Sequence, residues 1–113
     1  MISAATNLDR TFRALGDPTR RTMLRILAGG EQGVVELASN FELTQPAVTK
    51  HLNVLESAGL ISRQRRGRYR ICRLEPDAVQ RTADWLGDLR QYWMDRFSAI
   101  DELLANEKET EES

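Results

Sequence analysis

Residues 44–61, TQPAVTKHLNVLESAGLI, decide the fold because their front half is polar and their back half is apolar. Thr44 suits a helix N-cap, and Pro46 is tolerated only within the first turn of a helix. Gly59 then ends the helix. Three apolar residues at spacings of four and three form its buried stripe: Val48, Leu52 and Leu55. Five polar or cationic residues are expected on one exposed side: Thr44, Gln45, Thr49, Lys50 and His51.

Two helices and a short third one are predicted ahead of this stretch. Apolar spacing favours a first helix that carries Leu8 and ends at Gly16. The second begins with Asp17 as N-cap and Pro18 at its first position, and it stops at residues 29–30, both glycine. Its expected buried residues are Met23, Ile26 and Leu27. Residues 34–41 read as a brief helix, with Val34 or Val35 and Leu37 facing inward, before a tight turn.

Residues 60–74, LISRQRRGRYRICRL, read as a β-hairpin with its turn around Arg66–Gly67–Arg68. Pro76 opens a last helix expected to end near Leu104. Residues 106–113 are acidic without apolar anchors, which predicts a disordered tail after one domain over residues 1–105. The order of helices, turn, helix and ribbon predicts a mainly α protein with a β-hairpin wing, a winged helix-turn-helix.

The net charge of −1 hides a polarised distribution. Residues 61–74 hold six arginines and no acid, while the chain after residue 75 has an acidic excess. Arginines crowded on a ribbon repel each other, and their forked donors suit phosphates. Local fields of this kind attract a polyanion even when the average charge does not.

The polar front half of the helix over 44–58 and the arginine ribbon together predict contact with double-stranded DNA. A recognition helix enters the major groove by its N-terminal half, where short polar side chains reach base edges. A polar helix face by itself would indicate only a surface exposed to solvent. The arginine ribbon beside it is what favours contact with DNA. The expected DNA contacts are Thr44, Gln45, Pro46, Thr49, Lys50, His51, Arg63, Arg65, Arg66, Gly67, Arg68 and Tyr69.

Three motifs, RALGDPTRRTMLRIL, LTQPAVTKHLNVLESAGLI and RRGRYRICRL, resemble the ArsR-type (ArsR/SmtB) bacterial repressors over about residues 8–76. The resemblance implies a homodimeric winged-helix repressor that releases its operator when an effector binds; which effector, if any, stays open. Four residues match the family's recognition-helix positions: Gln45, Thr49, Lys50 and His51. Arg66, Gly67 and Arg68 match the wing tip. Cys72 stands where the family usually has an aromatic residue.

The metal site of the best-known members of that family is not expected here. Their Cys-X-Cys motif aligns with Gly33 and Val35, which carry no donor atoms, and residues 76–113 hold no histidine. With one cysteine and one histidine in the chain, neither a transition metal nor another cofactor is predicted. Cys72 is a candidate redox switch because arginines flank it, but it shares a strand face with Leu74 and is expected in the core.

The last helix carries apolar residues at 79, 86, 93 and 100, a heptad spacing that favours a two-fold partner but also fits packing within one chain. The family resemblance implies pairing through the first and last helices. The expected interface residues are Leu8, Phe12, Leu86, Leu89, Trp93, Phe97 and Ile100. A dimer would read a palindromic operator. Trp85, Tyr92 and Trp93 could alternatively line a small-molecule pocket.

Two other functions compete with DNA binding as interpretations of this sequence. The arginine ribbon could bind an acidic protein, in which case operator-like and scrambled DNA would bind equally. An enzyme is excluded by the lack of a nucleophile with its base, a phosphate-cradling glycine loop or paired carboxylates in a cleft. No membrane span or secretory signal is visible, and the single cysteine fits a reducing cytoplasm.

Overall fold

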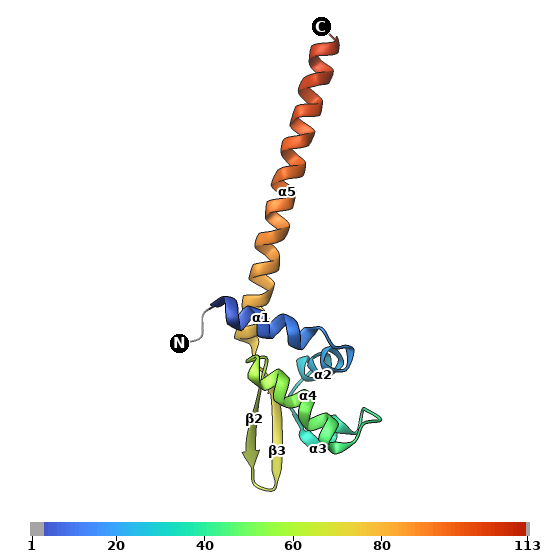
Figure 1. Ribbon diagram of the computed structural model, residues 1–113, viewed down its shortest axis with the longest axis vertical. Helices are drawn as coiled ribbons and strands as arrows, with labels where there is room; N and C mark the ends of the chain where they lie inside the picture. Colours follow the sequence, from blue (N-terminus) through green and yellow to red (C-terminus); the bar gives the residue numbers. More distant parts are fainter. Residues whose placement is uncertain (1–3, 113) are drawn as a thin grey trace. The chain divides into compact units, whose positions relative to one another are not determined.

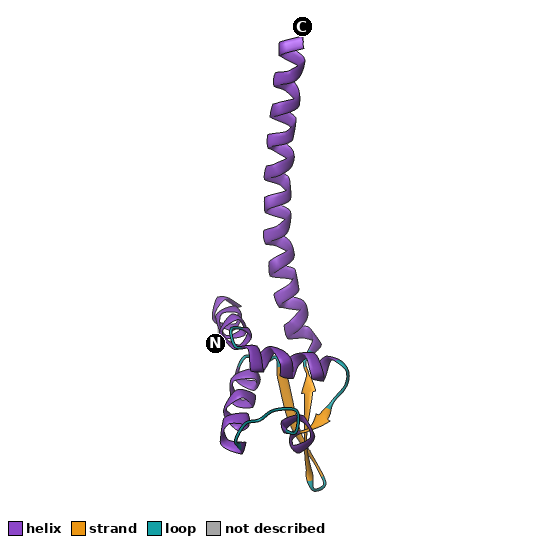
Figure 2. Ribbon diagram, turned by 90° about the vertical axis from the view of Figure 1, so that its right-hand side faces the viewer, coloured by secondary structure: helices purple, strands orange, loops and turns teal. Residues whose placement is uncertain are grey.

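The computed structural model describes the backbone of residues 4–112 and the side chains of residues 7–109. Along the chain the elements are α1 Ala4–Leu15, α2 Pro18–Ala28, β1 Gln32–Gly33, α3 Val34–Ala38, α4 Gln45–Ser57, β2 Ile61–Arg66, β3 Tyr69–Leu74 and α5 Pro76–Glu112. Figure 1 shows these elements coloured along the chain, and Figure 2 shows the same fold by type of secondary structure. Two compact units are distinguished, residues 1–80 and residues 81–113, so that α5 belongs to both.

The junction of α1 and α2 is held by side chains from the first turn of α2. Asp17 caps α2 by accepting a hydrogen bond from the backbone N–H of Arg20 at 3.0 Å, as the sequence predicts. The guanidinium of Arg20 donates to the carbonyls of residues 13 and 14, and Arg21 donates to the carbonyl of Leu15. The last carbonyls of α1, which have no partner within the helix, are thereby satisfied.

Helix α4 begins and ends where the sequence predicts. The hydroxyl of Thr44 accepts from the backbone N–H of Ala47 at 3.3 Å, and Pro46 lies in the first turn. After the helix, Gly59 takes φ +74°, a left-handed conformation that favours glycine. The apolar face of α4 packs against the core and fixes the rotation of the helix about its own axis, so the opposite, polar face is exposed.

The sheet has three antiparallel strands in the order β1-β3-β2. The hairpin of β2 and β3 pairs Ile61 with Leu74 at its base and Arg66 with Tyr69 at its end, and Gly67 turns it with φ +61°. The predicted hairpin and its turn are therefore confirmed. The two-residue strand β1 was not predicted, because two residues give no periodic signal.

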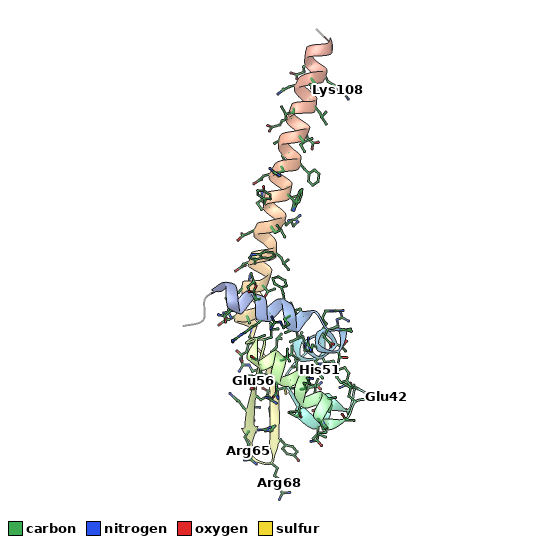
Figure 3. The ribbon with its side chains drawn as sticks, in the orientation of Figure 1. Glu42, His51, Glu56, Arg65, Arg68 and Lys108 are labelled. Carbon is green, nitrogen blue, oxygen red and sulfur yellow. The ribbon has the colours of Figure 1, made fainter. Side chains whose placement is uncertain are left out.

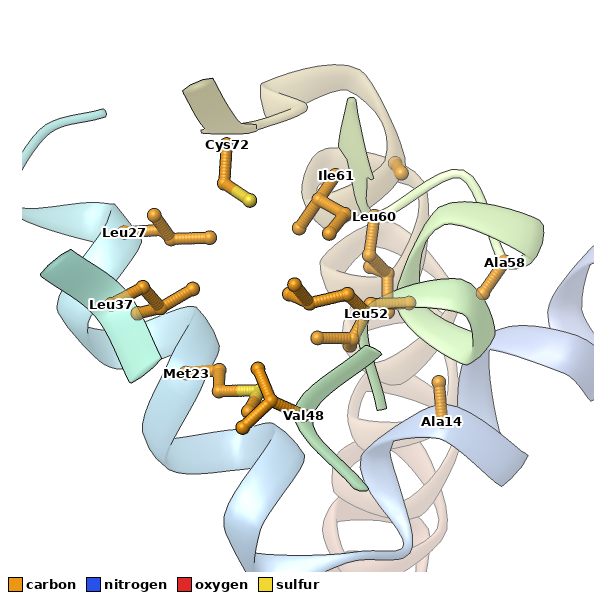
Figure 4. Close-up of a cluster of buried hydrophobic side chains, with 12 residues drawn as sticks. Ala14, Met23, Leu27, Leu37, Val48, Leu52, Ala58, Leu60, Ile61 and Cys72 are labelled. Carbon is orange, nitrogen blue, oxygen red and sulfur yellow. The ribbon is translucent and has the colours of Figure 1, made fainter. Parts of the chain in front are cut away.

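The core lies in the unit of residues 1–80, where helices and the base of the hairpin meet (Figure 4). Its largest fully buried side chains are Met23, Leu37, Leu52, Leu55, Leu60, Val48 and Cys72. Ile26, predicted in the same stripe as Met23, is only partly buried. Between the two candidates in α3, Val34 packs against the core and Val35 is 81% exposed. Cys72 is a core residue, as its strand face indicates.

Helix α5 runs to Glu112, past the end predicted near Leu104. Residues 106–112 are helical, so the prediction of a disordered tail is wrong for them, while Ser113 lies outside the described residues. Lack of apolar anchors does not end a helix that is already nucleated, since each further residue adds one hydrogen bond and Glu and Lys are good helix formers. A single domain over residues 1–105 stays a prediction that depends on what covers α5. No helix in the described part of the chain is both long and apolar enough to span a bilayer.

Candidate nucleic-acid interface

The exposed face of α4 presents several of the polar residues predicted to reach DNA. Gln45, Thr49 and Lys50 are exposed, and Asn53 continues the same face one turn further. Because Val48 and Leu52 are fully buried on the other side, this face is fixed outward. The first turn also has backbone N–H groups without partners inside the helix, which attract phosphate.

His51 does not share that face, so the expectation that it lies beside Thr49 and Lys50 is wrong. It is half-buried at the margin of the core, where its Nδ1 lies 3.3 Å from Nη1 of Arg20 and 3.8 Å from Oδ2 of Asp17. The position follows from helical geometry, since residue 51 lies next to residues 48 and 55 on the helix surface. The Arg20 backbone N–H, with the nearby charge of His51, lowers the pKa of Asp17.

The strand register divides the arginines of the wing, residues 61–74, between two faces. Directly paired residues of an antiparallel ladder point to the same side, and alternate residues point to opposite sides. Arg65 pairs with Arg70, on the side that also carries Arg63. Arg66 pairs with Tyr69, on the other side. Figure 3 labels Arg65 and Arg68 near the tip of the wing.

Arg63 is used inside the protein instead of being free for DNA. Its Nε donates to Oε2 of Glu56 at 3.0 Å, and its Nη2 donates to Oε1 of Glu56 at 3.1 Å and to Oδ1 of Asn53 at 2.6 Å. The hydrogen bond from Arg63 lowers the pKa of Glu56. Only 15% of the Arg63 side chain is exposed, and these hydrogen bonds make it a brace between the wing and α4, while its contact with DNA stays a prediction.

Arg66, predicted at the wing tip, is ion-paired with Glu31 in the loop before β1. Nη1 donates to Oε1, and Nη2 donates to Oε2 at 3.2 Å, a two-pronged arrangement. The hydrogen bond lowers the pKa of Glu31, with a smaller contribution from the charge of Arg73. Arg66 is therefore neutralised in this structure, although half of its side chain is exposed.

Four wing arginines, Arg65, Arg68, Arg70 and Arg73, form no ion pair within the part of the chain that the structure describes. Like charges directly opposite on a ladder, such as those of Arg65 and Arg70, destabilise the pair. A phosphate between them would reverse that penalty. Arg70 is not among the DNA contacts predicted from the sequence, although counting the hairpin register outward from residue 67 indicates it.

A groove of about 600 Å³ brings the recognition helix and the wing together. Gln45 and Thr49 line it from α4, and residues 34–36 line it from α3. The wing contributes Arg63, Arg68, Tyr69, Arg70 and Ile71. Two of the predicted helix contacts, Gln45 and Thr49, and two unpaired wing arginines, Arg68 and Arg70, thus line one shared space. Lys50 lies outside this groove, and Pro46 and Thr44 are exposed at the start of α4.

Two chemical features of the described residues concern candidate metal ligands and the thiol of Cys72. No group of three or more His, Cys, Asp or Glu side chains among them is placed to hold a metal ion. Burial raises the pKa of the Cys72 thiol, even though Arg63 nearby works in the opposite direction. A raised pKa suppresses the reactive thiolate, which argues against a redox switch at this position.

Residues 17–63 match the model of the bacterial regulatory protein arsR family. The chain is 33% identical to the transcriptional repressor SdpR of Bacillus subtilis over 70% of this chain and 88% of that one. It is 36% identical to the HTH-type transcriptional regulator Rv2034 of Mycobacterium tuberculosis over 94% of this chain and 96% of that one. The protein belongs to the ArsR family. It is a winged helix-turn-helix transcriptional regulator and not an enzyme.

Solved structures confirm this fold. The crystal structure of an ArsR family transcriptional regulator superposes with a TM-score of 0.75 at 35% identity, covering 83% of this chain and 97% of that one. The winged helix-turn-helix domain of Mb0332 from Mycobacterium bovis, described as homodimeric, shares the fold with a TM-score of 0.62 at 24% identity over 77% of this chain and 82% of that one. Regulators of this family bind DNA.

Proposed function

We propose that the protein is a dimeric transcriptional repressor that binds a palindromic operator, with α4 in the major groove and the wing on the backbone or in the minor groove. The observation that supports this most is the shared groove, in which Gln45 and Thr49 face Arg68 and Arg70. A solvated surface would not need base-reading groups and unpaired arginines in one space. The relatives of this protein include one that is named as a transcriptional repressor, SdpR.

The residues of α4 have distinct roles in this proposal. Gln45 offers an amide that pairs in two-pronged fashion with adenine, and Thr49 offers a methyl group to thymine or a hydroxyl to a base acceptor. Lys50 reaches guanine or a phosphate. Thr44 and Pro46 fix the start of α4, so that the free backbone N–H groups of its first turn face the phosphate backbone of the DNA. His51 holds α4 against α2 and does not read bases.

The wing supplies charge without sequence preference. Arg68 at the turn is positioned for a narrow minor groove, and Gly67 lets the turn approach the backbone closely. Arg65 and Arg70 flank one phosphate from two strands. Tyr69 is 68% exposed in the groove wall, where its hydroxyl can donate to a phosphate oxygen.

A second copy of the chain is the proposed cover for the apolar side chains of α5. Large apolar side chains that are 42–66% exposed continue along the helix from residue 85 to residue 104: Trp85, Leu86, Leu89, Tyr92, Trp93, Met94, Phe97, Ile100, Leu103 and Leu104. A monomer rarely leaves so long an apolar row in water. On α1, Phe12 is 36% exposed, whereas Leu8 is half-buried. A two-fold pair would set recognition helices about 34 Å apart for half-sites one turn apart.

Base reading is tested by footprinting the chain's own upstream region and then measuring binding to the protected site and to a scrambled duplex. Gln45→Ala is expected to cost about 1–3 kcal/mol on the site and little on the scrambled duplex. Arg68→Ala should weaken both and flatten the salt dependence. If wild-type protein binds the two duplexes equally, the wing serves an acidic protein partner instead, and the repressor proposal fails.

The dimer is tested by light scattering at concentrations used for DNA binding. Wild-type protein is expected at twice the chain mass, and the double variant Trp93→Asp with Phe97→Asp is expected to be monomeric, since two buried carboxylates cannot be compensated across a two-fold interface. Asp88→Asn on the same helix is the matched control and should stay dimeric. A monomeric wild type would contradict the proposal.

A regulator of this kind would act in the cytoplasm, where bacterial DNA lies.

A further inference from the structure

We propose that Arg10 and Arg13 of α1, together with Lys50 of α4, form a phosphate-binding pocket that contacts the DNA backbone beside the groove read by α4. This inference rests on the proposed function and adds a contact outside the recognition helix and the wing. Neither arginine was predicted to bind DNA, because α1 precedes the helix-turn-helix in the sequence and shows no basic run of its own.

The pocket lies between α1 and α4 and has a volume of about 310 Å³. Arg10 and Arg13 line it from α1, and Lys50, Asn53, Val54, Ser57 and Ala58 line it from α4. Three of these residues are cations and none is a carboxylate. Three like charges converging from two helices repel one another unless an anion lies between them.

The pocket also contains neutral donors and an apolar wall. Arg63 donates to Oδ1 of Asn53 at 2.6 Å, which assigns the oxygen of that amide to Arg63 and leaves its NH2 group to donate elsewhere. Ser57 adds a hydroxyl at the same wall. Val54 and Ala58 exclude water from one side, which strengthens charge-assisted hydrogen bonds to an oxyanion.

The two helical walls are held together by Arg20. Its Nη2 donates to the backbone carbonyl of Arg13 at 3.0 Å, and its Nη1 lies 3.3 Å from Nδ1 of His51, the neighbour of Lys50. The backbone that carries Arg13 is therefore fixed relative to the helix that carries Lys50. A site with positioned walls loses less entropy when an anion binds than two mobile side chains would.

The position of the pocket favours DNA over a free anion. Thr49 lines the groove and Lys50 lines the pocket, so adjacent residues of the exposed face of α4 serve the two spaces. A helix in the major groove has phosphates at both edges of that groove. The wing meets the phosphates on one edge, and Arg10 and Arg13 would meet those on the other.

The test compares wild type with the double variant Arg10→Ala and Arg13→Ala on the footprinted site and on a random duplex of the same length, over a range of salt concentrations. Each lost phosphate contact lowers the slope of log Kobs against log salt by about 0.9. The expected result is a slope reduced by about 1–2 on both duplexes, with discrimination between them unchanged. Arg25→Ala, an exposed arginine on α2, is the matched control and should leave the slope unchanged.

Two further measurements keep the outcomes distinct. Because α1 belongs to the proposed dimer interface, the variant Arg10→Lys with Arg13→Lys should keep both the dimer and most of the slope. An unchanged slope in the alanine variant, while wild type binds DNA, overturns this inference alone; a wild type that binds no DNA overturns the proposed function as well. If inorganic phosphate binds wild type at constant ionic strength and the alanine variant loses only that binding, the pocket serves a free anion and the DNA assignment is wrong.

Discussion

Arg63 on β2 and Glu56 on α4 are joined by two parallel hydrogen bonds, from Nε to Oε2 at 3.0 Å and from Nη2 to Oε1 at 3.1 Å. The same guanidinium also reaches Asn53, one turn earlier on α4. A planar fork bound to a carboxylate and an amide fixes direction as well as distance. The base of the wing is therefore tied to α4 at Arg63, which also lines the groove between them.

Replacing Arg63 by Ala is expected to loosen this arrangement without removing a phosphate contact. Discrimination between the footprinted site and a random duplex should fall, while the salt slope stays as in wild type. The free energy of unfolding should fall by less than about 1 kcal/mol, as for partly exposed ion pairs. Parallel titrations of Arg63→Ala and Arg68→Ala check this; a slope reduced as much in the first as in the second would mean that Arg63 touches DNA.

Glu31 is expected to weaken DNA binding by holding Arg66. In Glu31→Gln the guanidinium loses its charged partner and becomes available to a phosphate, so binding should tighten at low salt and the slope should steepen by about 0.9. The same pair of duplexes and the same salt series measure it. The double variant Glu31→Gln with Arg66→Ala is the control, because the gain should vanish when the freed arginine is absent. A gain that survives in the double variant would reflect only the loss of a repelling carboxylate.

The sequence predicted the parts of the fold that local chemistry decides. Thr44 and Asp17 cap their helices in the structure as their side chains indicate, and Gly67 turns the hairpin where the alternation breaks. These signals act within four residues of where they stand. The division of α4 into a buried stripe and an exposed face is likewise set by its own periodicity.

What the sequence could not show is how charged side chains choose partners far along the chain. Arg66 pairs with Glu31, thirty-five residues away, and Arg20 approaches His51, thirty-one residues away. No spacing rule connects such residues. An arginine that is ion-paired within the protein therefore cannot be told from an unpaired one by its sequence. Arg63 and His51 contact other side chains of the protein in the structure, and Arg70 joins the candidate site only once the strand register is known.

Cys72 is expected to be inert toward mild oxidants in the folded protein. Its side chain is fully buried and its pKa is raised by burial, so little thiolate forms near neutral pH. Mass spectrometry after brief peroxide treatment should find an unmodified thiol in native protein and an oxidised one in denaturant. Cys72→Ser should lower the free energy of unfolding by about 1–3 kcal/mol, since a hydroxyl would be buried without a partner. Oxidation of native protein together with loss of DNA binding would restore the redox switch.

Asp17 is expected to make the free energy of unfolding depend on pH in the acidic range. Its carboxylate accepts from the Arg20 backbone N–H and lies near His51, and both interactions lower its pKa below the ordinary value of about 3.9. A group with a lowered folded pKa contributes stability that is fully present above the unfolded pKa and is lost as the pH falls through the folded one. Urea unfolding between pH 2 and pH 6 should therefore show wild type losing stability below about pH 4.

The variant Asp17→Asn separates the charge from the cap. Asparagine is as good an N-cap as aspartate, so helix α2 should begin at the same residue. The pH-dependent part of the stability that Asp17 contributes should disappear. Near neutral pH the variant should be slightly less stable than wild type, and the two curves should converge as the pH falls toward 2. Asp17→Ala removes the cap as well and should cost about 0.5–2 kcal/mol. Parallel curves for wild type and Asp17→Asn over the whole range would show that the carboxylate has the same pKa folded and unfolded, and that its contact with the first turn of α2 is only geometric.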